Sequence, residues 1–248
     1  MTQRNVLVTG GIGGIGTAIV TAFAVNGYKV SAVYAPFEAG KIDSWQAARH
    51  EEGHHVHLFK ADVADFGSCE KLAAEVTATF GQVDVLVNCA GIIRDSAFKK
   101  MPFENWDQVM KVNLYSVFNV TRQFWGGMLD RNYGRVINIA SVNGQKGQFG
   151  QANYAASKAG MHGFSMSLAQ EGARHGVTVN TVSPGYTATE MMLQVPPQIL
   201  EDIKAHIPMR RLATPVEIAA AVTYLASDNA GFITGVNLDV NGGQWMHH

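Results

Sequence analysis

Tyr154 and Lys158 stand four positions apart within residues 144–160. Side chains at this spacing share one face of a helix. A tyrosine normally ionises near ~10, and a neighbouring ammonium lowers that pKa, so the pair predicts a tyrosine that can act as a general acid at a carbonyl. Ser141 can donate to the same oxygen as charge develops there. Taken alone, such a pair more often packs a lysine stem against an aromatic ring, so the prediction depends on the rest of the chain.

A second group of residues with chemical meaning is a cluster of glycines near the start of the chain. Gly10, Gly13, Gly14, Ile15 and Gly16 follow an apolar run and open a helical pattern. Glycine adopts the backbone angles of a tight turn at low cost. Its missing side chain also lets amide groups approach a pyrophosphate at a helix N-terminus. This context predicts a dinucleotide-binding loop.

These residues need a scaffold, and alternating strand-like and helix-like segments predict one. Seven β-branched runs are expected strands, at 5–10, 29–34, 55–62, 83–91, 134–141, 177–185 and 235–243. Five helical patterns lie at 16–27, 67–81, 104–129, 153–176 and 215–227. Together they predict an α/β fold, a single-domain doubly wound parallel sheet of Rossmann type with helices on both faces. We expect one domain over residues 1–248, with a substrate lid at about 188–212, where three prolines interrupt the alternation.

Composition limits the classes of function. A net charge of -1 with 16% charged residues gives no sign of binding to nucleic acid or an anionic membrane, and favours an oligomer. Cys69 and Cys89 fit no metal or redox spacing, and neither do the nine histidines, so we expect no metal and a cytoplasmic location. The uncharged stretch 6–28 holds too many glycines for a membrane helix. His247 and His248 fit either native residues or the remnant of a tag.

The motifs occur in an order that resembles the short-chain dehydrogenase/reductase family over nearly the whole chain. The matching residues are Thr9-Gly10, Gly14-Ile15-Gly16, Asp62-Val63, Asn88, Ala90-Gly91, Asn113, Ser141, Tyr154, Lys158 and Pro184-Gly185. The resemblance implies a catalytic group of Asn113, Ser141, Tyr154 and Lys158. It implies further cofactor contacts from Asp62, Val63, Asn88, Ala90 and Gly91 along the adenosine and from Pro184, Gly185 and Thr187 at the nicotinamide. Cys89 and Thr187 replace the usual asparagine and isoleucine, and neither change removes a reacting group.

The end of the second strand decides between NADH and NADPH, because the adenosine ribose lies there. By resemblance, NADPH-dependent relatives carry a cation just before Gly14 or in the loop after that strand. Here Gly13 holds the first position, and Ala35 and Glu38 precede any cation in the second. A carboxylate accepts hydrogen bonds from a ribose 2′-hydroxyl and repels a 2′-phosphate. We therefore expect a preference for NADH, with NADPH as the alternative if Lys41 reaches the site.

The segment VNGQKGQFGQ, residues 142–151, resembles the acetoacetyl-CoA reductases of polyhydroxybutyrate synthesis. That resemblance implies an acyl pocket formed by Asp95, Gln148, Phe149, Gln151 and Tyr186, with acetoacetyl-CoA or a similar short β-ketoacyl thioester as substrate. It also implies a homotetramer that pairs through helices at 112–129 and 159–172. A 3-oxoacyl-carrier-protein reductase, an alcohol or sugar dehydrogenase and a non-catalytic dinucleotide-binding protein remain alternatives.

Overall fold

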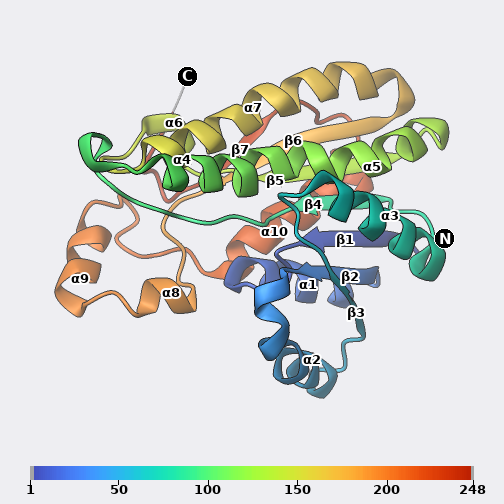
Figure 1. The fold of residues 1–248 in the computed structure, drawn as a ribbon, viewed down its shortest axis with the longest axis horizontal. Coiled ribbons are helices and arrows are strands. Elements are labelled where there is room, and N and C mark those ends of the chain that lie inside the picture. Colours follow the sequence, from blue (N-terminus) through green and yellow to red (C-terminus); the bar gives the residue numbers. More distant parts are fainter. Residues whose placement is uncertain (1–2, 247–248) are drawn as a thin grey trace.

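The seven expected strands form one parallel sheet. The structure, a computed structural model, describes residues 3–246, and His247 and His248 lie outside the described residues. The strand order is β3-β2-β1-β4-β5-β6-β7, the order of a doubly wound fold (Figure 1). The strands are β1 (Asn5–Thr9), β2 (Lys29–Tyr34), β3 (Val56–Lys60), β4 (Val85–Asn88), β5 (Gly134–Ile139), β6 (Val177–Pro184) and β7 (Asn237–Val240). The predicted fold class is confirmed.

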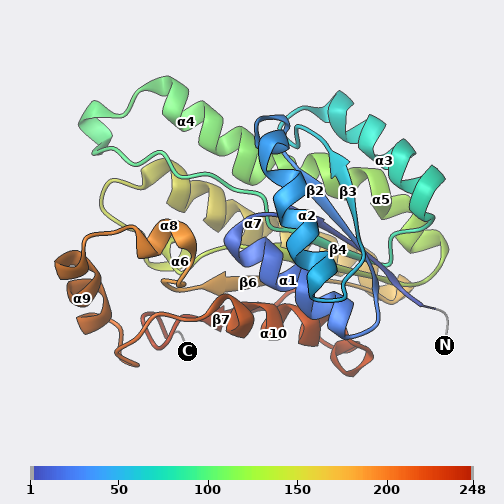
Figure 2. The same ribbon diagram turned by 90° about the horizontal axis from the view of Figure 1, so that it is seen from below.

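Helices cover both faces of the sheet, which explains why the strands are apolar along their whole length (Figures 1 and 2). In β1, Leu7 packs into one core, and Val6 and Val8 pack into the other. One face carries α1 (Gly14–Val25), α2 (Ile42–Glu51) and α10 (Pro215–Ala226). The other carries α3 (Phe66–Phe80), α4 (Phe103–Val109), α5 (Ser116–Asp130) and α7 (Ala152–Gly172). Both layers keep the carboxyl ends of the strands free for a site.

Two helical features differ from the sequence expectation. Helix α2 was not expected, because its sequence lacks a strong apolar stripe, and in the structure it buries no residue fully. The expected helix at 104–129 is interrupted between α4 and α5 by a π-helical turn, Met110–Tyr115. A π-bulge shifts the side chains that follow it around the helix axis. This turn contains Asn113.

The segment expected to be a lid contains two short helices, α8 (Glu190–Leu193) and α9 (Pro197–Ala205). Both stand out from the end of the sheet where the strands terminate (Figures 1 and 2). Another short helix, α6 (Asn143–Lys146), follows β5. No residue of α9 is buried. Within residues 3–246, no helix is long and apolar enough to cross a membrane.

Candidate active site

The glycine loop joins β1 to α1 so tightly that side chains do not fit. Gly10 has φ +62°, and a Cβ there would lie 2.8 Å from the Ala90 Cα. A Cβ on Gly16 would overlap the carbonyl oxygen of Gly10, and one on Gly14 would lie 2.9 Å from the Thr189 Cγ2. The Gly13 N-cap makes no side-chain hydrogen bond, and the first turn of α1 holds no acidic residue. These backbone amides can therefore hold a pyrophosphate, and the loop fits a nicotinamide dinucleotide.

The loop is fixed against the neighbouring strand by Thr9. Its buried Oγ1 accepts hydrogen bonds from the backbone N–H groups of Cys89 (3.1 Å) and Ala90 (3.2 Å). This contact places Ala90 and the following Gly91 at the carboxyl edge of the sheet, next to the glycine loop. Ala90 and Gly91, two of the residues expected along the adenosine, therefore lie beside the glycine loop.

Asn88 does not fit the expected position along the adenosine. Its side chain is only 4% exposed and donates from Nδ2 to Thr121 Oγ1 (3.1 Å) and Asn138 Oδ1 (2.8 Å). The amide therefore ties β4 to β5 and α5 inside the protein. The sequence places Asn88 correctly at a strand end, but only the tertiary structure shows that its side chain points inward.

The other residues expected along the adenosine lie at the carboxyl ends of β2 and β3. Asp62 is exposed just after β3, and its Oδ1 accepts from the Ala64 N–H at 3.0 Å, whereas the adjacent Val63 is buried. Ala35 precedes a single 3-10 turn, Pro36–Lys41. The half-buried Glu38 carboxylate accepts from the Ala35 N–H through Oε2 at 2.9 Å. One of its oxygens is thus used to cap the turn.

Ser141, Tyr154 and Lys158 come together at the end of β5. Ser141 lies two residues beyond β5, which ends at Ile139, so the expected strand was slightly too long. The Ser141 hydroxyl hydrogen-bonds with the Tyr154 side chain. Lys158 Nζ donates to the Ile139 carbonyl oxygen at 2.7 Å and lies 5.7 Å from the centre of the Tyr154 ring. One helix face and one strand end thus place three reactive groups side by side.

Burial changes the proton affinities of this group in a direction that the sequence did not predict. Burial raises the pKa of Tyr154, the hydrogen bond from Ser141 partly opposes this change, and the Asp95 charge adds to it. Burial also lowers the pKa of Lys158 to about 8, with Cys89 acting in the opposite sense. The expected lowering of the Tyr154 pKa is therefore wrong, because the net shift within the protein is upward. Desolvation is the largest cause of the Tyr154 shift.

Asn113 adjoins this group through the π-helical turn. Its Oδ1 accepts from the Ile92 N–H at 2.8 Å, and its Nδ2 donates to the Ile92 carbonyl (3.0 Å) and to Ser157 Oγ (3.2 Å). A Cβ on Gly91 would lie 3.3 Å from Asn113 Oδ1 and 3.5 Å from Lys158 Nζ. Asn113 therefore holds the 91–97 loop beside the lysine, and the four residues expected to be catalytic form one cluster.

The expected substrate residues lie in two places. Gln151 is buried and bonds to Asn143 and Asp95, whereas Gln148 and Phe149 are exposed on the preceding loop. Tyr186 lies in the wall of a cavity of about 590 Å³. That cavity is lined by the segments 185–186, 207–217 and 239–246. Among the described residues, no group of histidine, cysteine, aspartate or glutamate side chains could hold a metal.

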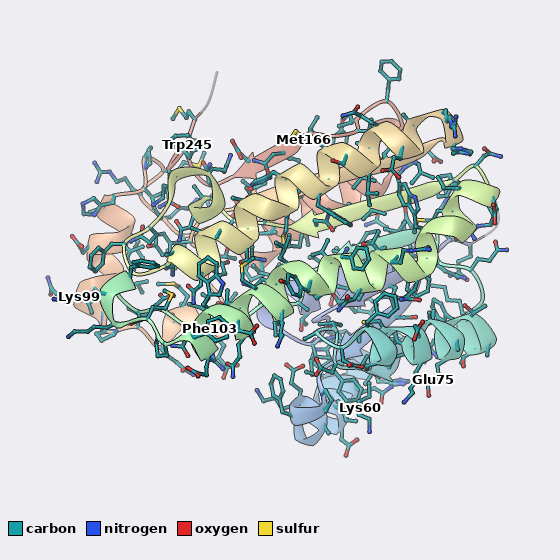
Figure 3. All side chains as sticks on the ribbon, turned by 45° about the horizontal axis from the view of Figure 1, so that its top comes forward. Lys60, Glu75, Lys99, Phe103, Met166 and Trp245 are labelled. Atoms are coloured by element: carbon teal, nitrogen blue, oxygen red, sulfur yellow. The ribbon has the colours of Figure 1, made fainter. Side chains whose placement is uncertain are left out.

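The residues expected at the nicotinamide lie at the end of β6 and directly after it. Pro184 ends the strand and is buried, and Gly185 packs so closely that a Cβ would lie 2.9 Å from the Asn241 Cα. The Thr187 hydroxyl donates to the Gly185 carbonyl at 3.1 Å. This tight turn leads the chain from the sheet into the segment expected to be a lid. Trp245 lies at the same end of the molecule as Lys99 and Phe103 (Figure 3).

Two residues that the sequence did not single out also support the site. Asn153 is fully buried and donates to the carbonyl groups of Arg94 (3.0 Å) and Asn105 (3.2 Å), while its Oδ1 accepts from the Tyr154 N–H (2.8 Å). Asn143 donates to Gln151 Oε1 at 2.9 Å. Asparagine beside a catalytic segment carries no periodic or motif signal, so only the contacts identify these roles.

The fold and this cluster define an NAD(P)-dependent oxidoreductase that acts on a carbonyl or the corresponding alcohol. The chain belongs to the short-chain dehydrogenase/reductase family, and residues 10–244 match the family model described as Enoyl-(Acyl carrier protein) reductase. It is 57% identical over 244 residues to the acetoacetyl-CoA reductase of Allochromatium vinosum, which covers 98% of this chain and 99% of that protein.

Two further relatives match over similar lengths. The acetoacetyl-CoA reductase of Cupriavidus necator is 49% identical over 246 residues, or 99% of this chain and 100% of that protein. Nodulation protein G of Azospirillum brasilense is 48% identical over 244 residues, or 98% of each chain. The similarity therefore extends over the whole fold, including the glycine loop, the reactive cluster and the lid segment.

Proposed function

We propose that this protein is an acetoacetyl-CoA reductase that uses NADH to reduce the 3-keto group and forms (R)-3-hydroxybutyryl-CoA for polyhydroxybutyrate synthesis. The observation that carries the proposal is the cluster of Ser141, Tyr154 and Lys158 at the carboxyl edge of a dinucleotide-binding sheet, in which Ser141 and Lys158 are buried and Tyr154 is half-buried. The names of several relatives at 46–57% identity support the substrate.

The chain's own residues supply proton transfer and charge stabilisation. The bound nicotinamide cofactor supplies the hydride. Tyr154 is held in its protonated form by burial, so it can donate its proton to the carbonyl oxygen as negative charge develops there. Ser141 donates a hydrogen bond to the same oxygen. Lys158 would hold the ribose of a bound nicotinamide cofactor and pass a proton toward Tyr154, and Asn113 keeps the adjoining loop in place.

Two other reactions fit parts of the same site. The family model is described by the name of an enoyl reductase, which acts on a carbon–carbon double bond. The hydroxyls of Ser141 and Tyr154 instead suit a carbonyl oxygen, because two adjacent donors stabilise a developing alkoxide. A 3-oxoacyl-carrier-protein reductase would use this cluster unchanged. The acyl carrier therefore has to be determined by experiment.

The function is tested by NADH oxidation with acetoacetyl-CoA, with the same acyl group on carrier protein, and with crotonyl-CoA. We expect the highest kcat/KM with acetoacetyl-CoA. Tyr154→Phe should retain NADH binding and lose about a thousandfold or more in kcat, because it lacks the donated proton. A higher kcat/KM with carrier protein or crotonyl-CoA would contradict the substrate, and an active Tyr154→Phe enzyme would contradict the proton donor.

The preference for NADH rests on the Glu38 carboxylate. One of its oxygens caps the turn at Ala35, and the other is available to a ribose hydroxyl. Glu38→Gln keeps an oxygen for the cap and removes only the charge. We expect this variant to reduce the ratio of kcat/KM for NADH over NADPH by about tenfold, as loss of one charge–charge repulsion would.

Glu51→Gln is the matched control, because Glu51 is an exposed carboxylate on α2, the helix that follows this turn. It should leave the cofactor ratio as in the wild type. A wild-type enzyme that prefers NADPH would contradict the proposal directly. An unchanged ratio in Glu38→Gln would show that another group sets the preference.

The remaining proposals concern the oligomeric state, the cellular location and the segment 188–212. We infer a homotetramer with 222 symmetry, because α4, α5 and α7 leave large apolar side chains exposed, among them Phe103, Phe118 and Met166. Figure 3 labels two of them, Phe103 and Met166. The free Cys69 and Cys89 suit a reducing cytoplasm. The segment 188–212 is proposed to close over the substrate.

A further inference from the structure

A chain of side-chain hydrogen bonds crosses the active site from the 91–97 loop to α6. Gln151 Nε2 donates to Asp95 Oδ2 at 2.8 Å, and Gln151 Oε1 accepts from Asn143 Nδ2 at 2.9 Å. The Asn143 backbone N–H then donates to Ser141 Oγ at 3.1 Å. These four residues are called the amide relay below. It joins the 91–97 loop to α6 and to the start of α7, which lie 8 residues apart at Asn143 and Gln151.

Gln151 occupies the centre of the amide relay and is 9% exposed. Its oxygen and one of its amide hydrogens are already bonded to protein groups. A side chain held at both ends and largely buried is poorly placed to turn toward a substrate oxygen. The geometry favours Gln151 as a strut between Asp95 and Asn143 over a direct ligand of the ketone.

Asn143 connects this strut to the reacting group. Its side chain is 8% exposed, and in the described part of the chain its Oδ1 has no hydrogen-bond partner, so the bond to Gln151 is the contact that orients the amide. Because the Asn143 N–H donates to Ser141 Oγ, the serine proton must point elsewhere. Its hydrogen-bond partner in that direction is Tyr154.

We infer that Asn143 is a positioning residue that acts through the amide relay. It fixes the direction of the Ser141 hydroxyl, and Asp95 and Gln151 hold Asn143 in place. The inference rests on the proposed function, because it concerns the reduction step of that site. It changes the expected roles of Asp95 and Gln151 from walls of an acyl pocket to supports of the serine.

The donor-to-acceptor direction of the hydrogen bonds in the amide relay can be tested. If these side chains only packed against one another, reversing that direction would not restore activity. Asn143 donates to Gln151, and Gln151 donates to a carboxylate, so the direction is set by the acid at Asp95. Asn143→Asp places a carboxylate at each end of Gln151, and the glutamine oxygen must then face one of them. Adding Asp95→Asn reverses the direction of both hydrogen bonds of Gln151. The amide introduced by Asp95→Asn then donates to the glutamine oxygen, and the glutamine amide donates to the carboxylate introduced by Asn143→Asp.

The experiment measures kcat with NADH and acetoacetyl-CoA for all four combinations of Asn143→Asp and Asp95→Asn. We expect Asn143→Asp to reduce kcat by about tenfold to a hundredfold when Asp95 is present, and by less than about threefold when residue 95 is asparagine. NADH affinity, measured by fluorescence titration, should not change. Equal losses in both backgrounds would overturn the inference.

Asn143→Asp combined with Glu104→Gln is the matched control, because Glu104 is an exposed carboxylate in the first turn of α4. This pair has the same net charge as the rescued variant but leaves the amide relay mismatched, so kcat should stay low. Recovery in the control would mean that net charge alone matters, and would overturn the inference.

A second cycle covers the case in which Asn143→Asp does not fold. Asn143→Ala and Gln151→Ala break the same connection, so the double variant should lose no more kcat than the worse single variant. Additive losses would contradict the relay. A wild-type protein without turnover on acetoacetyl-CoA would instead contradict the proposed function, which keeps the two failures distinguishable.

Discussion

At the scale of residues, the chemistry of this site is governed by desolvation. The surroundings of Tyr154 and Lys158 raise the pKa of the phenol and lower the pKa of the ammonium to about 8, and desolvation is the largest cause of both shifts. Both shifts favour the neutral form of each group. The tyrosine is thereby kept as a proton donor, and the lysine can exchange its proton near neutral pH.

The lysine shift predicts a pH dependence of stability. The folded-state pKa of Lys158 is about 8 and its ordinary value is 10.5, so between these pH values the unfolded chain binds a proton that the folded chain has released. The free energy of unfolding should therefore rise with pH across this window, by about 3 kcal/mol from this group. Denaturant unfolding of the wild type and Lys158→Met at several pH values measures the difference.

Lys71→Met controls for removal of a positive charge, because Lys71 is exposed on α3. The difference in free energy of unfolding between the wild type and Lys158→Met should change across this pH window. The same difference for Lys71→Met should stay constant. A constant difference for both variants would contradict the shift at Lys158.

At the scale of elements, the site depends on how closely α6 packs against α7. A Cβ on Gly144 in α6 would lie 2.9 Å from the Ala159 backbone N and from the Lys158 carbonyl carbon. Close approach of these two helices is thus possible only with glycine. Because α6 carries Asn143 and follows Ser141, its position sets the distance between the serine and α7.

Gly144→Ala should push α6 away from α7 and separate Ser141 from Tyr154. We expect kcat to fall by about a hundredfold, because a small misplacement of a catalytic donor is costly. Gly67→Ala in α3 is the control, because a Cβ there meets only the Asp65 Oδ1 at an ordinary 3.5 Å. Full activity in Gly144→Ala would mean that α6 can shift without moving the serine.

At the scale of the whole molecule, the outer helices present more apolar surface than a monomer needs. Phe118 on α5 is 50% exposed and stacks on Phe66 of α3 with ring centres 6.2 Å apart. Tyr115 and Met166, also about half exposed, extend the apolar area toward α7. A second copy of the chain, related by a twofold axis, would cover these side chains in the proposed tetramer.

Phe118→Glu should therefore dissociate the proposed tetramer, because it buries a charge in an apolar interface. Light scattering at micromolar concentration should give a tetramer for the wild type and a smaller species for the variant. Phe37→Glu is the control, because Phe37 is 84% exposed on the turn after β2 and lies outside the proposed interface. A monomeric wild type would contradict the tetramer, and a tetrameric Phe118→Glu would exclude this face.

The sequence by itself determined the parallel α/β sheet, the glycine loop and the grouping of Ser141, Tyr154 and Lys158. Each of these is encoded locally, by apolar periodicity, by backbone freedom at glycine or by helical spacing. All seven strands appear at the expected places. Helix α2 was missed because it lacks a strong apolar stripe.

Only the tertiary structure decided how polar side chains are used. Asn88 points inward, burial reverses the expected pKa shift of Tyr154, and Gln151 bonds to residues 8 and 56 positions away. Contacts over such separations leave no periodic signal, and desolvation depends on what the whole fold packs around a group. The reaction class could therefore be predicted from the sequence, whereas the means by which its serine and tyrosine are held could not.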